Sequence, residues 1–262
     1  MIRTDLHVHS TWSDGKNTLS EIAEEALARG IRALGFSDHV YAPYDTDCCM
    51  KPGMRASYQR EVARLREQYR GKMDVYCGVE QDLFSDEPTD GYDYVIGAVH
   101  YLKIGDQYLT VDWKPELLLQ AADLLGDIYA AAELYFDQVS RVAEIPGCKV
   151  IAHFDLIRKL NRDGSLFDQG HPRYRAAWKQ AANRLLKSGL PFEINTGAIS
   201  LGYQTDPYPD GEIVDYLAAR GARFVLGSDS HRKETLLYAF ERQERLAREK
   251  GLTLLEEAKE WL

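Results

Sequence analysis

Histidines and carboxylates of this chain recur where strand-like segments end. Six of the seven histidines lie at or just beyond such ends, and only His171 lies elsewhere. His7 and His9 are two residues apart on one segment, so their side chains point the same way and can bind one ion together. The other segment ends carry further ligand types: Asp38 and His39, Glu80, His100, His153, Glu193 and Asn195, and Asp229 and His231.

The residue types in this set favour a catalytic metal site. Imidazole and carboxylate suit zinc, iron or manganese, and the lack of cysteine in the set disfavours a structural zinc site. Each histidine alone is more often a buried or surface side chain than a ligand, but the whole set predicts a multinuclear site. With Asp14, Glu80 and Asp229 ionised, three divalent ions would leave an inner shell of about +3, which attracts a phosphate dianion. Ions about 3.5 to 4 Å apart can share a hydroxide and hold phosphoryl oxygens, as in phosphoester hydrolysis.

Strand-like and helical patterns alternate along the chain and would position these residues. Apolar runs typical of buried strands occur at 2–9, 31–36, 73–79, 94–99, 149–152, 191–194 and 222–226. Apolar residues at helical spacing predict helices at 19–29, 57–70, 115–143, 174–187, 210–220 and 233–250. Thr18 and Glu21 form a capping box that opens the first helix, and Gly30 ends it.

This alternation predicts an α/β fold with a parallel sheet and helices outside it. No linker, low-complexity tract or internal repeat divides the chain, so we expect residues 1–262 to form a single domain. The expected architecture is a closed or nearly closed TIM-like (β/α)7 barrel of seven strands with a short C-terminal extension. A doubly wound open sheet is the alternative, and it would gather ligands at one switch point instead of around a ring of strand ends.

Composition excludes several function classes. The chain has 262 residues with 41 acidic and 32 basic side chains, and a net charge of -9 argues against a broad grip on nucleic acid or an anionic membrane. No run approaches the roughly 18 apolar residues of a membrane-spanning helix. The first ten residues hold charges and histidines instead of an apolar signal segment, and the four cysteines are scattered, so we expect a cytoplasmic protein.

Short motifs around the candidate ligands are more specific than the ligands themselves. They are Asp5-Leu6-His7-Val8-His9-Ser10 with Ser13-Asp14-Gly15, Ser37-Asp38-His39, Gly78-Val79-Glu80, Gly97-Ala98-Val99-His100, Ala152-His153 and Gly227-Ser228-Asp229-Ser230-His231. With these motifs the sequence resembles the polymerase and histidinol phosphatase (PHP) superfamily over nearly its whole length, and within it the histidinol-phosphate phosphatase branch. The resemblance implies a distorted seven-stranded barrel.

The resemblance also implies a trinuclear centre of zinc, iron or manganese and assigns its ligands. The first ion would be held by His7, His9, Glu80 and Asp229, the second by Glu80, His100 and His153, and the third by Asp14, His39 and His231. The implied chemistry is in-line attack of a metal-bridging hydroxide on phosphorus, with Asp14 among the residues required for turnover. The leaving alkoxide takes a proton, and Asp229 or His231 can supply it through a bound water.

The implied substrate is a small phosphorylated alcohol, with hydrolysis of L-histidinol phosphate to L-histidinol in histidine biosynthesis as the leading reading. Phe154-Asp155-Leu156-Ile157-Arg158 resembles the segment that supplies a phosphate-binding cation in this branch, which assigns Arg158 to the substrate. A solvated loop arginine is the alternative reading of Arg158. The chain departs from the branch at residues 197–202, where Gly-Ala-Ile-Ser-Leu-Gly lacks the usual basic residue.

Two other functions stay open. A phosphodiesterase or exonuclease of the same superfamily would use the same ions on nucleotides, but it would need a basic track with aromatic platforms, and the sequence shows no such Lys/Arg cluster. A catalytically inactive metal-binding module is disfavoured because every ligand position is filled. The sequence leaves the oligomeric state undetermined.

Overall fold

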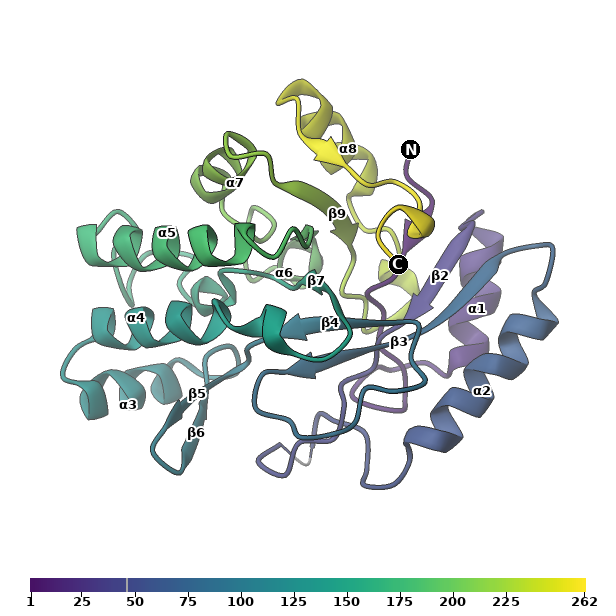
Figure 1. Cartoon of the computed structure of the whole chain (residues 1–262), viewed down its shortest axis with the longest axis horizontal. Coiled ribbons are helices and arrows are strands. Elements are labelled where there is room, and N and C mark those ends of the chain that lie inside the picture. Colours follow the sequence, from purple (N-terminus) through teal and green to yellow (C-terminus); the bar gives the residue numbers. More distant parts are fainter. Residues whose placement is uncertain (46) are drawn as a thin grey trace.

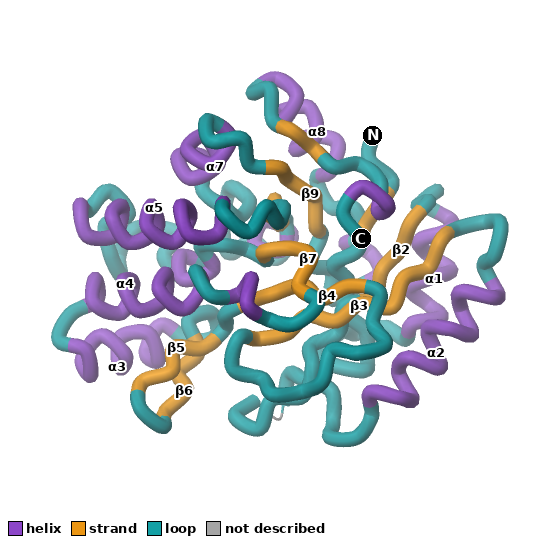
Figure 2. Tube along the Cα trace, in the orientation of Figure 1, coloured by secondary structure: helices purple, strands orange, loops and turns teal. Residues whose placement is uncertain are grey.

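A computed structural model describes residues 1–45 and 47–262. Eight parallel strands form one curled sheet in the order β1-β2-β3-β4-β7-β8-β9-β10, and β5 and β6 form a separate antiparallel hairpin (Figures 1 and 2). The sheet strands are β1 (Thr4–Asp5), β2 (Ala33–Phe36), β3 (Asp74–Asp82), β4 (Tyr94–Ala98), β7 (Cys148–Ile151), β8 (Phe192–Asn195), β9 (Arg223–Gly227) and β10 (Thr253–Leu254). The hairpin strands are β5 (Tyr101–Ile104) and β6 (Gln107–Thr110).

Helices cover the sheet, and α3, α4 and α5 stack side by side on one flank (Figure 1). The α-helices are α1 (Leu19–Ala28), α2 (Arg55–Gln68), α3 (Pro115–Leu125), α4 (Ile128–Val139), α5 (Pro172–Leu186), α6 (Gly197–Ser200), α7 (Gly211–Ala218) and α8 (Phe240–Glu249). Short 3-10 turns occupy Val142–Glu144, Leu156–Arg158, Lys233–Thr235 and Ala258–Glu260. The predicted capping box at the start of α1 is present, because Thr18 and Glu21 bond each other's backbone N–H groups.

The strand order confirms the predicted parallel α/β fold and departs from the doubly wound alternative, whose order reverses at a switch point. The sheet curls until the chain beyond β1 lies beside the chain beyond β9. There, His9 N donates to Ser230 O at 2.9 Å, and Ser230 N donates to His7 O at 3.2 Å. Side chains that follow the first and last core strands are thereby brought together.

Four details of the predicted elements were wrong. In the expected helix 233–250, only Phe240–Glu249 is α-helical, and it is preceded by a 3-10 turn at Lys233–Thr235. The expected seven-stranded sheet has an eighth strand, because the C-terminal extension adds β10 alongside β9. The loop around Gly105 is the hairpin β5–β6. The expected helix 115–143 is divided into α3 and α4, because Gly126 adopts a φ of 103° and the Asp127 side chain then caps α4 by accepting from Ala130 N at 2.8 Å.

A small apolar cluster contains Leu6, which follows β1, together with Ile96 of β4, Val150 of β7 and Val225 of β9. Tyr94 crosses it and donates its hydroxyl to Leu6 O at 2.6 Å. The Tyr94 ring packs against Gly78 of β3. Only glycine fits at that position, because a Cβ on Gly78 would lie 2.1 Å from the ring. This packed floor lies below the strand ends that carry the candidate ligands.

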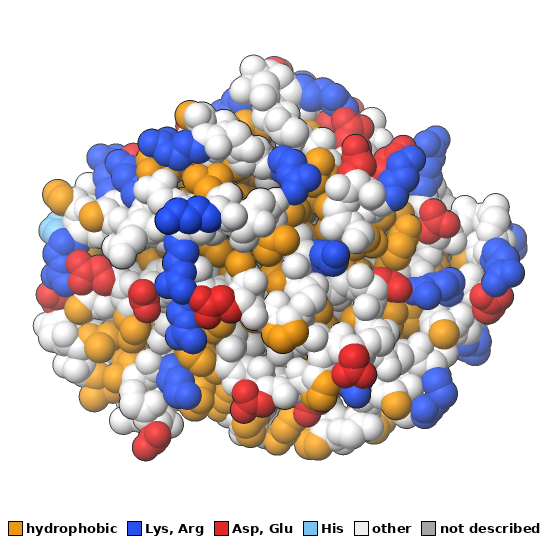
Figure 3. Space-filling model, in the orientation of Figure 1, with side chains coloured by type: hydrophobic (Ala, Val, Ile, Leu, Met, Phe, Trp, Pro, Cys, Tyr) orange, Lys and Arg blue, Asp and Glu red, His pale blue; other side chains and the backbone are white. Residues whose placement is uncertain are grey.

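Acidic and basic side chains are mixed on the surface of the molecule. Figure 3 shows acidic and basic side chains on the same face of the molecule, and ion pairs such as Arg184 with Glu144 and Arg173 with Asp127 place them side by side. Across the described residues, no helix combines the length and apolar character that a membrane crossing requires. The four cysteines, all within the described part of the chain, are free thiols.

Candidate metal centre

All nine predicted metal ligands converge at the carboxyl ends of the parallel strands, as the alternating pattern requires. They come from five strand ends, from one strand and from one loop. His7 and His9 follow β1, Asp14 lies in the next loop, His39 follows β2, Glu80 lies in β3, His100 follows β4, His153 follows β7, and Asp229 and His231 follow β9. Nearly the whole length of the chain separates the first ligand from the last.

Glu80 lies at the centre of the group and is 1% exposed. Its Oε2 faces three ring nitrogens: His7 Nε2 at 3.2 Å, His9 Nε2 at 3.3 Å and His39 Nδ1 at 3.1 Å. Its Oε1 faces His153 Nε2 at 2.8 Å and His100 Nε2 at 3.4 Å. The two carboxylate oxygens therefore face two different sets of imidazoles, which is the geometry of a carboxylate between two ion positions.

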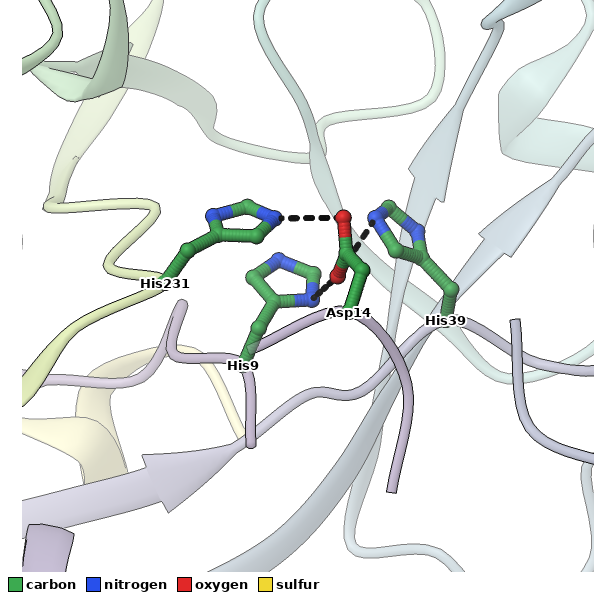
Figure 4. A group of neighbouring side chains, drawn as sticks. All are labelled: His9, Asp14, His39 and His231. Atoms are coloured by element: carbon green, nitrogen blue, oxygen red, sulfur yellow. Dashed lines mark ion pairs between the residues drawn. The ribbon is translucent and has the colours of Figure 1, made fainter. Parts of the chain in front are cut away.

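Asp14 is the centre of a second group, in which three imidazoles point toward its carboxylate (Figure 4). Its Oδ2 lies 3.2 Å from His231 Nε2, and its Oδ1 lies 3.9 Å from His39 Nε2 and 4.0 Å from His9 Nδ1. One ligand atom from each of these four residues lies within 4.8 Å of the others, which is compatible with a shared ion. His9 stands beside Asp14 as well as Glu80, whereas the resemblance assigned it to the first ion alone.

Asp229 completes a third group with His7 and His9. Its Oδ1 lies 3.2 Å from His9 Nε2 and 3.6 Å from His7 Nε2. The backbone at Asp229 has a φ of 51°, in the left-handed region that costs energy for a residue other than glycine, although aspartate tolerates it better than most. This conformation turns the carboxylate toward the imidazoles.

Opposed charges hold the carboxylates ionised. Burial alone would raise the pKa of Glu80 and of Asp229, but the neighbouring histidines, His7 foremost, hold both pKa values well below their usual range. Burial, with the charges of His231 and His39, lowers the pKa of His9 to about 3. Burial also opposes the charge on His231, yet the hydrogen bond and charge of Asp14 raise its pKa to about 9.

Several polar atoms in this site are buried without a hydrogen-bond partner among the described residues. They are His7 Nε2, His9 Nδ1, His9 Nε2 and Glu80 Oε2. His7 Nε2 and His9 Nε2 face Glu80 Oε2, and His9 Nδ1 faces Asp14 Oδ1. An unpaired buried polar atom is costly, and these atoms fit divalent cations, whose coordination would satisfy them. The nitrogen and oxygen donor set suits zinc, iron or manganese.

Two further carboxylates, those of Asp38 and Asp82, accept hydrogen bonds from segments that carry the candidate ligands. Asp38 accepts from Ser10 Oγ at 2.8 Å and Ser13 Oγ at 2.7 Å, which fixes the loop that carries Asp14. Asp82 Oδ2 accepts from His100 N at 2.8 Å. The sequence reasoning missed Asp82, although it lies two residues after Glu80 on one strand and therefore on the same face.

Arg158, which the resemblance assigned to the substrate, is 3% exposed and bound within the protein. Its Nε donates to Asp155 Oδ2 at 2.8 Å, its Nη1 donates to Gln204 Oε1 at 3.1 Å, and its Nη2 donates to the carbonyl of Pro207. These contacts depart from both readings of Arg158, the phosphate ligand and the solvated loop arginine. They indicate a residue that anchors the loop around Gln204.

The next residue, Lys159, is paired with Asp112 and was missed by the sequence reasoning. Its Nζ donates to Asp112 Oδ2 at 2.8 Å and lies 5.2 Å from the centre of the Tyr203 ring. Burial opposes its charge, but the attraction of Asp112, and to a smaller extent of Asp229, raises its pKa. Lys159 is therefore a protonated cation within electrostatic reach of Asp229.

The segment that lacks a basic residue forms the short helix α6. Gly197 begins it and donates its N–H to Asn195 Oδ1 at 2.8 Å. A Cβ at Gly197 would lie 3.0 Å from Asp229 Oδ2, so a small residue leaves room for the carboxylate. The loop after β8 thus approaches the site with backbone and not with a cationic side chain.

Comparison with known proteins gives concordant matches. The family model of the PHP domain matches residues 5–197. The chain is 27% identical to the histidinol-phosphatase of Bacillus subtilis over 265 residues, which covers 92% of this chain and 98% of that protein.

Two solved structures share the fold. A Listeria monocytogenes protein assigned as a histidinol phosphatase superposes with a TM-score of 0.79 at 16% identity, over 91% of this chain and 99% of that one. The histidinol phosphate phosphatase of Lactococcus lactis, in complex with zinc, L-histidinol and phosphate, superposes with a TM-score of 0.73 at 19% identity, over 96% and 95% of the two chains.

Proposed function

The chain belongs to the PHP domain family, and on that premise we propose that it is a metal-dependent phosphomonoesterase that hydrolyses L-histidinol phosphate to L-histidinol. The similarity to the Bacillus subtilis histidinol-phosphatase extends over nearly the full length of both chains. The observation that carries the proposal is the position of Glu80, whose two oxygens face five buried or half-buried imidazoles. This hydrolysis would be a step of histidine biosynthesis.

We propose that three divalent ions of zinc, iron or manganese bind in this site. The ligands are assigned in three sets: His7, His9, Glu80 and Asp229; Glu80, His100 and His153; and Asp14, His39 and His231. Bound ions of this kind activate water as a nucleophile and neutralise the charge on phosphoryl oxygens. The interatomic distances support the assignment, since the members of each set lie together and each set contains at least one carboxylate.

Lys159 takes the role of phosphate cation in this proposal, in place of Arg158. Its ammonium group is half-buried, and Asp112 holds it in position. A cation at this point draws the phosphate dianion into the site and orients it toward the Asp229 end of the centre. It also offers a replacement for the basic residue that is missing from 197–202.

Asp229 and His231 adjoin each other at this end, with His231 Nδ1 3.6 Å from Asp229 Oδ1. We assign to this pair the transfer of a proton to the leaving oxygen through a water molecule. Asp14, bonded to His231 Nε2, orients the imidazole for that role. All three are expected to be required for turnover.

Phosphate release tests the substrate directly. L-histidinol phosphate, an aryl phosphate and an aryl phosphodiester are each offered to protein loaded separately with zinc, manganese or iron. Selective turnover of L-histidinol phosphate supports the proposal. Turnover of the aryl monoester alone retains the chemistry and rejects the substrate, preference for the diester indicates a phosphodiesterase, and inactivity on all three indicates a binding module.

A further inference from the structure

Glu193 is a buried carboxylate of β8 that the ligand assignment does not use. It is 1% exposed, and it makes the shortest contact of any carboxylate with His7, 2.6 Å from Glu193 Oε1 to His7 Nδ1. Its other oxygen accepts from His153 N at 3.1 Å and from Asn195 Nδ2 at 3.0 Å. Glu193 therefore contacts the side chain of one proposed ligand and the backbone of another.

The contact with His7 decides which ring nitrogen faces the centre. A neutral imidazole has one N–H donor and one lone pair, and a carboxylate beside Nδ1 places the proton there. The lone pair then lies on Nε2, which is 3.2 Å from Glu80 Oε2 and has no hydrogen-bond partner within the described part of the chain. Such a carboxylate behind a ligating histidine fixes the ring and makes it a better ligand.

Asn195 extends the same network to Asp229. Its Nδ2 is shared between Glu193 Oε2 at 3.0 Å and Asp229 Oδ2 at 3.1 Å, and its Oδ1 accepts from Gly197 N. Because Asp229 holds a left-handed backbone conformation, its carboxylate benefits from a fixed partner. His7 and Asp229, both assigned to the first ion, are thus oriented through one pair of side chains.

The sequence reserves space for Glu193. Gly227, on the neighbouring strand β9, is paired in register with Asn195, and a Cβ at Gly227 would lie 1.8 Å from Glu193 Oε1. Any larger residue there would displace the carboxylate that contacts His7. The φ of Gly227 is not positive. The site therefore requires the small size of this glycine and not its conformational freedom.

We propose that Glu193, together with Asn195, is a positioning residue that sets the affinity of the ion held by His7, His9, Glu80 and Asp229. It leaves the ions at the other ligand sets unaffected, because its contact with His153 is to the backbone N–H and not to the imidazole. The inference rests on the proposed metal centre. It predicts that removing the carboxylate weakens one ion selectively by about ten- to a hundredfold. A purely structural role would instead lower the stability of the fold and weaken all ions together.

The test is cobalt binding to chelated protein, followed by equilibrium dialysis and by the visible absorption of the bound ion. Glu193→Gln and Asn195→Ala are compared with wild type, and Gly227→Ala provides a variant that keeps every donor but displaces Glu193. Glu244→Gln is the control, because Glu244 is also a largely buried carboxylate, accepts from Ile2 N at 2.7 Å and lies on α8 away from the ligands.

The expected result is that one cobalt ion binds ten- to a hundredfold more weakly in Glu193→Gln and Gly227→Ala, with a changed absorption band, while the remaining ions keep their affinity. Asn195→Ala shows the same selective loss to a smaller extent, and Glu244→Gln loses thermal stability without any change in affinity. Equal weakening of all ions, or unchanged affinity in folded Glu193→Gln, overturns the inference. Because binding is measured without substrate, inactivity of the wild type on L-histidinol phosphate would reject the proposed function and leave this test intact.

Discussion

Glu80 Oε1 lies 2.8 Å from His153 Nε2, although 73 residues separate the two in the chain. The contact joins β3 to the end of β7, and on its other oxygen Glu80 faces the histidines that follow β1 and β2. A single buried carboxylate thus connects imidazoles from across the sheet. Loss of its charge should affect more than one ion.

Glu80→Gln should lower kcat by about three orders of magnitude or more, because two ion positions lose their shared anionic ligand. Metal analysis of the purified variant should show fewer bound ions per chain than wild type. Glu116→Gln is the control, since Glu116 is an exposed residue in the first turn of α3. Full metal content with full activity in Glu80→Gln would contradict the central position assigned to this carboxylate.

Lys159→Met should raise KM for the phosphomonoester about ten- to a hundredfold, because a charge-assisted bond to phosphate contributes about 1.5 to 3 kcal/mol. Metal content should not change, since Lys159 contacts Asp112 and none of the assigned ligands. Steady-state kinetics on metal-loaded protein checks this. An unchanged KM would return Lys159 to a structural role as the partner of Asp112.

Arg158→Ala should act on the fold and not on substrate binding. The substitution leaves Asp155 buried without its cation and removes the bonds to Gln204 and the Pro207 carbonyl. Breaking a buried pair from one side costs about 3 to 5 kcal/mol of unfolding free energy. Urea unfolding measures the loss. A stable variant with a raised KM would instead support the original reading of Arg158 as a phosphate ligand.

Gly78→Ala should destabilise the protein by several kcal/mol, because the added methyl overlaps the Tyr94 ring, which is buried and bonded to Leu6 O. Gly211→Ala is the matched control, since nothing lies within 4 Å of a Cβ there and the residue begins α7. Thermal unfolding of the two variants should differ clearly. Equal stability would mean that the Tyr94 floor can rearrange.

Metal-free protein should show a pH-dependent contribution from His231. Its pKa is raised to about 9 in the folded state against about 6.5 in an unfolded chain, so the protonated form favours folding. This stabilisation is fully present below pH 6.5 and is lost as the pH rises through about 9. The unfolding free energy of chelated wild type should therefore exceed that of His231→Gln most near pH 6, on the order of 3 kcal/mol, and approach it by pH 10. A difference that is constant with pH would contradict this origin.

The parallel sheet and the convergence of the candidate ligands were predictable, because buried strands have apolar runs and the candidate ligands follow these runs directly. His7, Glu80 and His153 could be placed at one end of the sheet from topology alone. The break between α3 and α4 at Gly126 could not be predicted, because the apolar spacing continues across it and only the positive φ of Gly126 ends the helix.

The direction in which each side chain of a turn points could also not be predicted from the sequence. Arg158 and Lys159 are adjacent at a 3-10 turn, and whether the first or the second faces the site depends on tertiary partners such as Asp155 and Asp112. Glu193 was visible as a strand-end carboxylate, but its contact with His7 depends on the curl of the sheet, which brings β8 beside the chain after β1.

Stepwise metal loading tests the central claim most directly. Chelated protein is titrated with zinc, and phosphate release from L-histidinol phosphate is measured beside the number of bound ions per chain. We expect no turnover in the metal-free protein, with activity rising only after more than one ion is bound and reaching its maximum near three. Turnover by the fully chelated protein, or full activity with a single bound ion, would contradict a multinuclear centre built around Glu80.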